Sequence, residues 1–293
     1  MLSKFFVYID LILGRIIFSS LLPFSYCLIN KKIDKKINKK LKTSNYSTIL
    51  QKKGFFIFNK KYEKFADNLN LIIKKQIFEN NIKVKDVFYY EINDEIKLLI
   101  RDFLNKEAKD LFEEIYNIFG LNIFITNIIL RRTVNINSSK EIYNNFFHFD
   151  KHTKNHMKIF FNLHDMNKDN GPTKIIPKLL SKRLLKNNFF NRRGNYVPKE
   201  NEVNDIYKNK EKKGSFIVCN TTECLHAASI PKNNNFRDIL TITTIATPMI
   251  NSNNIFFLDN KENEEYFWNG DSSLSKKFAK PKIKDLFKFY QNF

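Results

Sequence analysis

The hydrophobic period of the chain changes near Gly120, and this change constrains the fold more than any other feature. Before Gly120, apolar residues recur at the spacing of amphipathic helices, first in residues 61–81 and again in residues 95–119. After it, residues 121–136 are β-branched and aromatic, and predict a strand or a pair of strands. Gly120 stands where the second helical pattern would end. We therefore expect helices first and strands afterwards.

The second half of the chain predicts several short strands separated by polar segments. Strand-like runs occupy residues 156–164, 173–177, 214–219 and 238–247. Residues 178–213 are polar and lack a clear period, so we expect a lid or insertion outside the core. Helices followed by short strands are typical of an α+β fold, here with a mainly β core of two sheets. We place this main domain at residues 46–250, and a C-terminal extension at residues 251–293.

Residues 1–45 form a separate segment that is apolar first and basic afterwards. Residues 5–29 are strongly apolar, but charged residues and Pro23 interrupt the run, which fits neither a spanning helix nor a secretory signal. In residues 31–42, lysine pairs recur every four residues opposite a narrow apolar stripe. Such a segment can lie on an anionic membrane surface, or it can pack on the domain as an ordinary terminal helix. Both alternatives stay open.

The composition is that of a globular protein with a strongly basic surface. Hydrophobic residues make up 43% of the chain, and the formal net charge is +20. Thirty Phe, only seven Gly and abundant Lys and Asn are typical of an AT-rich genome, which explains much of this charge as a solvated lysine surface. A nucleic-acid binder would need clustered arginines and interleaved aromatics on a recognisable motif. The lysines here are diffuse, so we expect no nucleic-acid partner.

The cysteines argue against a disulfide framework. Cys27, Cys219 and Cys224 are odd in number and form no CxxC motif, which fits a reducing, cytoplasmic compartment. Cys219 and Cys224 have a spacing that a zinc site could use, and this alternative stays open.

The histidines indicate a metal site. His148 and Asp150 lie two residues apart in NNFFHFDKH, and alternate residues of a strand point to the same face. The pair alone is a weak signal, because a surface histidine near an aspartate is common. His226 follows an apolar run in GSFIVCNTTECLHAAS and would bring a third ligand from a distant element. Two imidazoles and one carboxylate leave open positions on octahedral iron(II), which is the arrangement of non-haem iron oxygenases.

Arg237 is the candidate for binding an oxoacid co-substrate. It lies eleven residues after His226 and begins the apolar run DILTITTIATP. If His226 closes one strand and Arg237 opens the next, a hairpin brings the guanidinium alongside the metal, with a geometry suited to a carboxylate. Thr241 and Thr243 share one face of this run. They could add hydroxyl contacts to the oxoacid, or they could be plain strand formers.

Four pieces of the sequence, in this order, resemble the phytanoyl-CoA dioxygenase family of 2-oxoglutarate oxygenases. They are HFD at 148–150, FFNLHDMNKDNGPTKIIP at 160–177, the GSFIVCN run leading to His226, and Arg237, which together cover about residues 120–248. The resemblance implies a double-stranded β-helix, or jelly roll, with helices packed outside. It also implies that His148, Asp150 and His226 bind iron(II), and that Arg237 holds the C5 carboxylate of 2-oxoglutarate.

The resemblance further implies the class of reaction. Such enzymes use O₂ and decarboxylate 2-oxoglutarate to succinate while they hydroxylate a substrate, which here could be a lipid or acyl thioester, a glycan or a small metabolite. Asp150 is present where related halogenases leave room for chloride, which favours hydroxylation. Phe147, before the first ligand, is compatible with the family. Pro177 is followed by Lys-Leu-Leu-Ser instead of the frequent Gly-Ser-His turn, so the expected lid begins differently.

Two further expectations concern the surroundings of the site. We expect the strand in residues 156–164 to pair next to the strand that carries His148, with a turn at Asn170-Gly171. We do not expect His152, His156 or His164 to be ligands. The alternative to an enzyme is a non-catalytic jelly-roll binding protein, which would have no need of the intact triad and arginine.

Overall fold

The structure is a computed structural model, and it describes most of the main domain. The described residues are 45–79, 87–119, 122–135, 146–150, 156–187, 205–232, 234–247, 255–257 and 268–269. The segment for which we predicted membrane contact lies outside these residues, apart from Asn45. Among the described helices, none combines the length and apolarity needed to cross a membrane.

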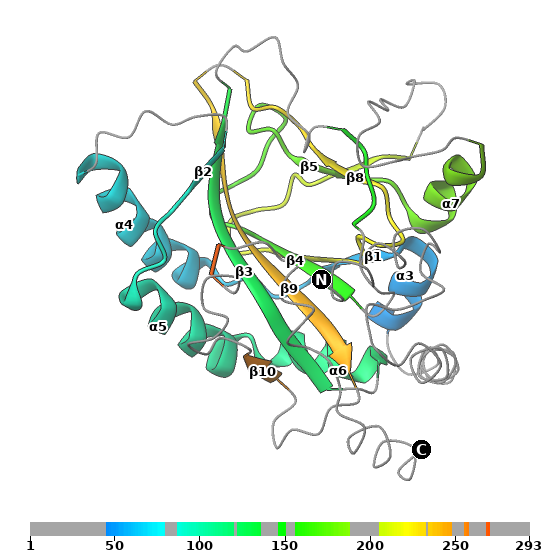
Figure 1. Cartoon of the computed structure of the whole chain (residues 1–293), viewed down its shortest axis with the longest axis horizontal. Coiled ribbons are helices and arrows are strands. Elements are labelled where there is room, and N and C mark those ends of the chain that lie inside the picture. The colour runs from blue at the N-terminus through cyan, green and yellow to red at the C-terminus, as the bar shows by residue number, and fades with distance from the viewer. Residues whose placement is uncertain are drawn as a thin grey trace, which may run out of the picture.

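The strands form two sheets (Figure 1). The larger sheet has the order β1 (Phe55–Phe58), β7 (Phe216–Cys219), β4 (His156–Asn162), β9 (Phe236–Thr247), β3 (Asn122–Val134) and β10 (Ile255–Phe257), and β2 (Val87–Tyr89) also pairs with β3. The smaller sheet has the order β6 (Tyr207–Lys208), β5 (Thr173–Ile175) and β8 (His226–Ala228). All pairings are antiparallel except that of β10 with β3.

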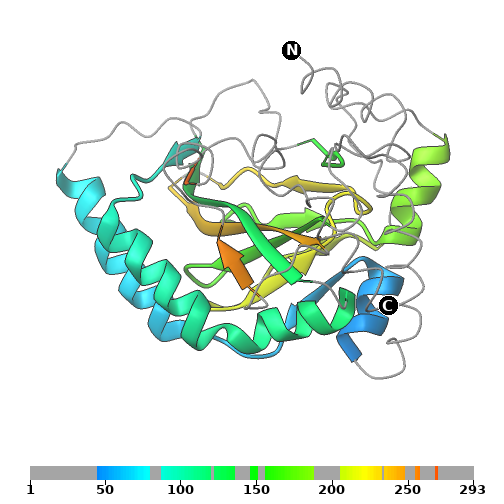
Figure 2. The same ribbon diagram turned by 60° about the horizontal axis from the view of Figure 1, so that its bottom comes forward.

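Three helices cover the outer side of the larger sheet (Figure 2). They are α4 (Glu63–Glu79), α5 (Asp94–Asp102) and α6 (Lys109–Phe119), while α3 (Asn45–Lys53) precedes β1 and α7 (Lys178–Asn187) follows β5. The side chain of Asn93 caps α5 by accepting a hydrogen bond from the Ile96 N–H. Residues 95–119 are not one helix, because the π-helical turn Phe103–Glu107 separates α5 from α6. This wider turn still buries Phe103 and Leu104.

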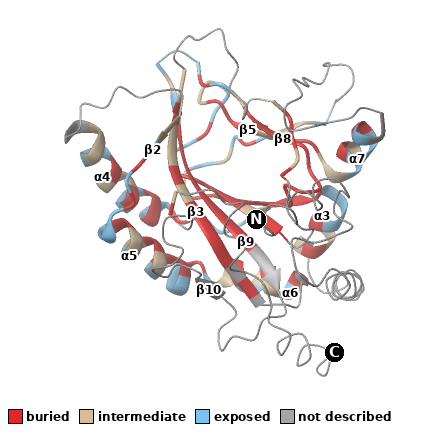
Figure 3. Ribbon diagram, viewed as in Figure 1, coloured by how far each residue is buried: buried red, intermediate tan, exposed pale blue. Residues whose placement is uncertain are grey.

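Aromatic side chains fill the layer between these helices and the sheet, which is buried in Figure 3. The ring of Phe65 on α4 stacks on Phe103 with the centroids 3.6 Å apart. Phe161 of β4 and Phe216 of β7 pack against this pair. Full burial of one such side chain contributes about 1.5–3 kcal/mol, so this cluster is the main attachment of the helices to the sheet.

The long pairing of β3 with β9 divides the residues of both strands between two environments. The register runs from Asn122 opposite Thr247 to Val134 opposite Phe236, with one irregularity between Ile125 and Asn127. Because successive residues point to opposite faces, Leu130 and Leu240 face the helices. Arg131 and Thr241 have the opposite parity and face the space between the sheets.

Two pairing expectations are wrong. His148 lies in no strand beside β4; it forms an isolated bridge with His226, while β4 lies between β7 and β9. The apolar outer residues of β4 belong to the aromatic layer, which explains its central position in the larger sheet. The hairpin between His226 and Arg237 is also absent, because His226 opens β8 of the smaller sheet, whereas Arg237 lies in β9 of the larger one.

Parts of the expected insertion and extension pack on the main domain. The Ser181 hydroxyl on α7 donates to the Ile176 carbonyl and accepts from the Leu225 N–H, each at 2.9 Å, which joins α7 to the end of β5 and the start of β8. In the C-terminal region, Trp268 forms a bridge with Ile128 and is buried. A lid function for residues 178–213 stays a prediction.

A buried ion pair joins β3, β9 and the strand region near β2. Arg132 donates to both oxygens of Asp238, at 2.8 Å from Nε and 2.6 Å from Nη2, and the Tyr90 hydroxyl donates to the same carboxylate at 2.9 Å. Asp238 is 2% exposed. Removal of one partner from such a pair leaves a charge that neither water nor protein compensates.

We therefore predict that Asp238→Ala lowers the free energy of unfolding by about 3–5 kcal/mol, because Arg132 loses its counter-ion. Tyr90→Phe is the matched control, and should cost only about 1 kcal/mol for one hydrogen bond. Urea unfolding followed by circular dichroism measures both. Equal losses for the two variants would contradict the importance of the ion pair.

Candidate metal centre

Three predicted side chains, those of His148, Asp150 and His226, meet at one buried point. One ligand atom from each lies within 4.8 Å of the others, and all three residues are buried. Two backbone hydrogen bonds join the His148 and His226 segments: His148 N–H donates to His226 O at 3.1 Å, and His226 N–H to His148 O at 3.0 Å. The Asp150 N–H donates to Thr221 O at 2.9 Å. The backbone thus brings two distant segments together without help from a ligand.

The histidine rings are oriented for metal binding. Nδ1 of His148 lies 2.8 Å from the Phe146 carbonyl, and Nδ1 of His226 lies 3.2 Å from the Cys224 carbonyl. A carbonyl oxygen only accepts, so we assign the proton to Nδ1 in both rings, which leaves each Nε2 lone pair for a metal. Nε2 of His226 is 3.7 Å from Asp150 Oδ2.

The charge state of His226 suits the same role. Burial, and next the positive charge of a protonated His148, lower the pKa of His226 to about 3. The imidazole is therefore neutral at pH 7, which is the form that coordinates a metal ion.

Lys158 is a neighbour of the triad that the sequence analysis missed. Its Nζ lies 2.7 Å from Asp150 Oδ2, and its side chain is only 17% exposed. It stands on β4 opposite Cys219 of β7 and Thr243 of β9. The available signal was a lysine within the apolar run HMKIFF, on the parity that faces the space between the sheets. A metal ion would share the Asp150 carboxylate with this ammonium group.

Arg237 is buried on β9, on the face turned toward the space between the sheets, and has no counter-ion among the described residues. It is 2% exposed; Nη1 donates to the Gly171 carbonyl, and Nη2 to the Thr133 hydroxyl at 3.2 Å. Its Nε has no hydrogen-bond partner, and no carboxylate pairs with the guanidinium, within the part of the chain that the structure describes. Burial, and then the charge of Arg131, lower the pKa of Arg237 to about 9. It remains charged at pH 7 and fits an anionic ligand.

The predicted Asn170-Gly171 turn supports this arginine. Gly171 has φ +70°, and a Cβ atom there would lie 2.5 Å from the Ser229 carbonyl oxygen and 2.6 Å from the Pro231 nitrogen. Both neighbours are backbone, so only glycine fits without a shift. The Gly171 carbonyl that accepts from Arg237 is therefore held in place by the turn.

A cavity of about 70 Å³ lies between the sheets at this centre. Its lining comprises Ile129, Arg131, His148, Lys158, Phe160, Thr173, His226, Ala227, Ala228 and Thr241. Thr241 is 3% exposed, and its hydroxyl has no hydrogen-bond partner among the described residues. Thr243 is also buried but does not line this cavity. A contact between the oxoacid and Thr241 stays a prediction. The lining of the cavity favours Thr241 over Thr243 for this contact.

The remaining histidines and cysteines belong to no other donor cluster in the described residues. His156 is fully buried at the start of β4, and Nε2 of His164 accepts from the Asp238 N–H at 3.0 Å. His152 lies outside the described residues. Cys219 and Cys224 are free and buried, and they form no zinc-like group with other described donors.

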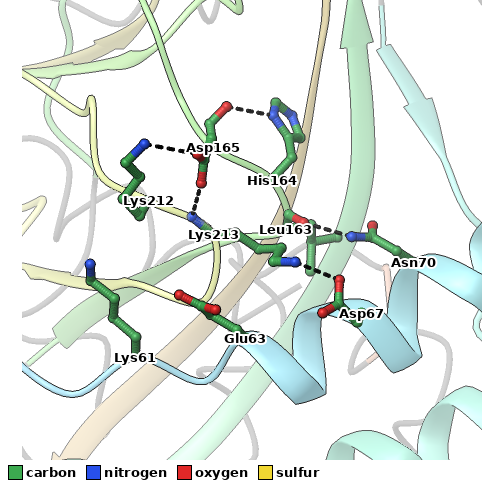
Figure 4. Close-up of a pocket in the computed structure, with 9 residues that line it drawn as sticks. All are labelled: Lys61, Glu63, Asp67, Asn70, Leu163, His164, Asp165, Lys212 and Lys213. Carbon is green, nitrogen blue, oxygen red and sulfur yellow. Dashed lines mark hydrogen bonds and ion pairs between the residues drawn. The ribbon is translucent and has the colours of Figure 1, made fainter.

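A second, wider hollow of about 670 Å³ lies near the start of α4 (Figure 4). Its charged lining residues balance in sign: Lys61, Lys212 and Lys213 against Glu63, Asp67 and Asp165. Ion pairs cross it at 2.9 Å, from Lys212 to Asp165, and at 2.7 Å, from Lys213 to Asp67. The hollow therefore has no excess charge for a ligand.

Comparison with known proteins places the fold. No protein-family model and no curated protein matches the sequence. Among solved structures, HygX from Streptomyces hygroscopicus with nickel and 2-oxoglutarate bound matches with a TM-score of 0.52 and 9% identity, over 71% of this chain and 88% of that one. The epimerase SnoN in complex with Fe³⁺, alpha-ketoglutarate and nogalamycin RO matches at 0.50 and 8%, over 73% and 84%. The chain has the jelly-roll fold of the 2-oxoglutarate oxygenases. The predicted fold class is confirmed.

We predict that the purified protein binds one equivalent of Co²⁺, measured by calorimetry under argon. His148→Ala, Asp150→Ala and His226→Ala should each weaken metal binding by at least about 100-fold. Loss of a hydrogen bond that merely supports a ligand already costs about 10- to 100-fold, and each of these variants removes the metal-binding atom itself. His164→Gln should leave the affinity unchanged. Metal binding that survives all three alanine variants would remove these residues from the site.

Proposed function

We propose that this protein is an Fe(II)- and 2-oxoglutarate-dependent dioxygenase that hydroxylates an organic substrate. The observation that carries the proposal is the meeting of the His148, Asp150 and His226 donors at one buried point beside a small cavity, together with a buried Arg237 that has no counter-ion among the described residues. Iron(II) together with 2-oxoglutarate supplies the oxidation of a substrate C–H bond, coupled to decarboxylation of the oxoacid to succinate.

The triad fits iron(II) by its donor set. Two neutral nitrogens and one carboxylate oxygen suit a borderline metal and leave coordination positions for small ligands. The Nδ1 hydrogen bonds to the Phe146 and Cys224 carbonyls fix the rings, which is the usual support of a metal-bound histidine.

The wall next to the triad fits 2-oxoglutarate. A dicarboxylate needs a cation at the end remote from the metal, and Arg237 offers a guanidinium whose buried Nε has no described partner. Thr241 adds a buried hydroxyl on the same face of β9. Phe160 and Ile129 give the cavity apolar walls that limit the entry of water.

Hydroxylation is the outcome that the residues favour. The jelly-roll fold alone does not select it, because the similar SnoN is described as an epimerase. Asp150 provides a third protein donor and so leaves no vacancy for a halide. The substrate is proposed to be an organic molecule small enough to reach this cavity, with O₂ as the second co-substrate.

One observation favours the alternative, a non-catalytic binding protein on the same scaffold. Lys158 already pairs with Asp150 at 2.7 Å, so the carboxylate has a counter-ion without a metal. A non-catalytic binding protein would need neither the two histidine nitrogens nor the buried Arg237, and for this reason we prefer the enzyme.

The experiment that decides between them is anaerobic addition of Fe(II) and 2-oxoglutarate. We expect a weak visible charge-transfer band, followed by succinate after exposure to O₂. The variant with alanine at positions 148, 150 and 226 is the control and should show neither signal. A wild-type protein that binds both cofactors separately but gives no band and no succinate would be a binding protein.

The role of Arg237 has its own test. Arg237→Met should raise the dissociation constant for 2-oxoglutarate by about 10- to 100-fold, as expected for loss of a charged hydrogen-bond donor, while Co²⁺ affinity stays within about threefold. Arg237→Lys should recover part of the loss. In the wild type, 2-oxoglutarate affinity should decline as the pH rises above about 9, where Arg237 loses its proton. An unchanged oxoacid affinity in Arg237→Met would remove this residue from the site.

A further inference from the structure

The cavity holds more positive charge than the proposed cofactors need. Arg131 and Lys158 line this cavity, and Arg237 lies on the same face of the β3–β9 pair; the only carboxylate that pairs with any of these three cations among the described residues is that of Asp150. Iron(II) and 2-oxoglutarate carry equal and opposite charges, so their binding leaves the sum unchanged. An excess of cations in a buried space is costly unless an anion enters.

Composition does not explain this excess. The chain has only eight arginines among its 50 basic residues, as its lysine-rich composition leads one to expect. Three of the eight, Arg131, Arg132 and Arg237, lie on β3 and β9. Arg132 has Asp238 as its partner on the outer face. Arg131 and Arg237 point the other way, where the described residues offer neither of them a carboxylate.

Of the three cations, only Arg131 has neither a carboxylate partner among the described residues nor a proposed ligand. Lys158 has Asp150, and Arg237 is the proposed partner of the oxoacid. Arg131 lines the cavity, its Nε is buried, and its side chain makes no hydrogen bond with any residue that the structure describes. A guanidinium presents a planar set of donors that matches a carboxylate or a phosphate.

The register places Arg131 close to Arg237 and Thr241, the two residues proposed to hold the oxoacid. Arg131 of β3 is opposite Ile239 of β9. Arg237 and Thr241 each lie two residues from Ile239 along β9, one on either side, so both are diagonal neighbours of Arg131. Diagonal neighbours of this kind lie about 7–8 Å apart, within reach of two different groups in one cavity. Arg237 is held back by Gly171 and Thr133, whereas Arg131 faces the open volume.

We propose that Arg131 is a substrate-binding residue, and that the substrate carries an anionic group, a carboxylate or a phosphate, which pairs with it. This inference rests on the proposed function and narrows its substrate class. A neutral lipid, an uncharged glycan or a cationic metabolite would leave the Arg131 guanidinium unpaired when the cavity closes around it, and would bind correspondingly weakly.

The test uses a small-molecule extract of the native host, separated on an anion exchanger at pH 7. Each fraction is added to the iron-loaded enzyme with 2-oxoglutarate, and stimulation of succinate formation is measured. We expect the stimulating compound in the retained fraction. Phosphatase treatment of that fraction distinguishes the two anions, since it abolishes stimulation only for a phosphate ester. Stimulation confined to the unbound fraction, or none in the retained fraction, would overturn the proposal.

Variants connect the effect to Arg131. Arg131→Met should raise the amount of retained fraction needed for half-maximal stimulation by about 10- to 100-fold, with Arg131→Lys recovering part of the loss. Its dissociation constant for 2-oxoglutarate should stay within about threefold of the wild type, unlike that of Arg237→Met. Lys106→Met, on the helical surface, is the control for net charge.

The outcomes separate this inference from the proposed function. If Arg131→Met weakens 2-oxoglutarate binding as much as Arg237→Met does, Arg131 belongs to the oxoacid site and the substrate assignment is wrong. If the wild type shows neither the charge-transfer band nor succinate, the proposed function fails, and the inference fails with it.

Discussion

The alternation of β3 and β9 is the constraint on which the rest of the structure depends. These two strands pair along almost their whole length, and every second residue must face the aromatic layer. Leu130, Leu240 and Ile242 do so, which obliges Arg131, Arg237 and Thr241 to face the space between the sheets. A slip of one residue would place the guanidinium groups in the aromatic layer and the leucines against the cavity, so the register is strongly determined. The core and the site are thus two consequences of one pairing.

The triad depends on a different element of the same architecture, the crossing between the sheets. After β7, the turn at Asn220–Thr222 carries the chain to the smaller sheet, and the Thr221 carbonyl accepts from Asp150 on the way. His226 then opens β8 and exchanges two backbone hydrogen bonds with His148. Because backbone pairing already holds the donors together, metal binding need not supply the energy to order these segments. This differs from small metal-dependent domains that fold only when the metal binds.

Local patterns in the sequence were sufficient for part of this picture. The period change at Gly120 predicts the order of elements, and the spacing of His148 and Asp150 predicts that they share a face. Strand partners were not predictable in the same way, because pairing depends on residues far apart in the chain. The expected hairpin of Arg237 with the His226 strand failed for this reason, although its parity on β9 still places Arg237 on the face turned toward the space between the sheets. Strand β1, the short run FFIF placed among helices, was missed because it pairs only with the distant β7.

Charged residues on the surface and charged residues between the two sheets differ in what they say about function. A lysine on the surface costs little to keep, so the composition of the genome can set its frequency, and the net charge of +20 says little about function. A charge between the two sheets loses its hydration, and it persists only if a partner compensates it. Lys158 was overlooked, and Arg131 was counted as part of a strand, because a linear sequence does not show which side of a strand closes over a cavity. Once the sheets are in place, the few buried cations are more informative about ligands than all the exposed ones together.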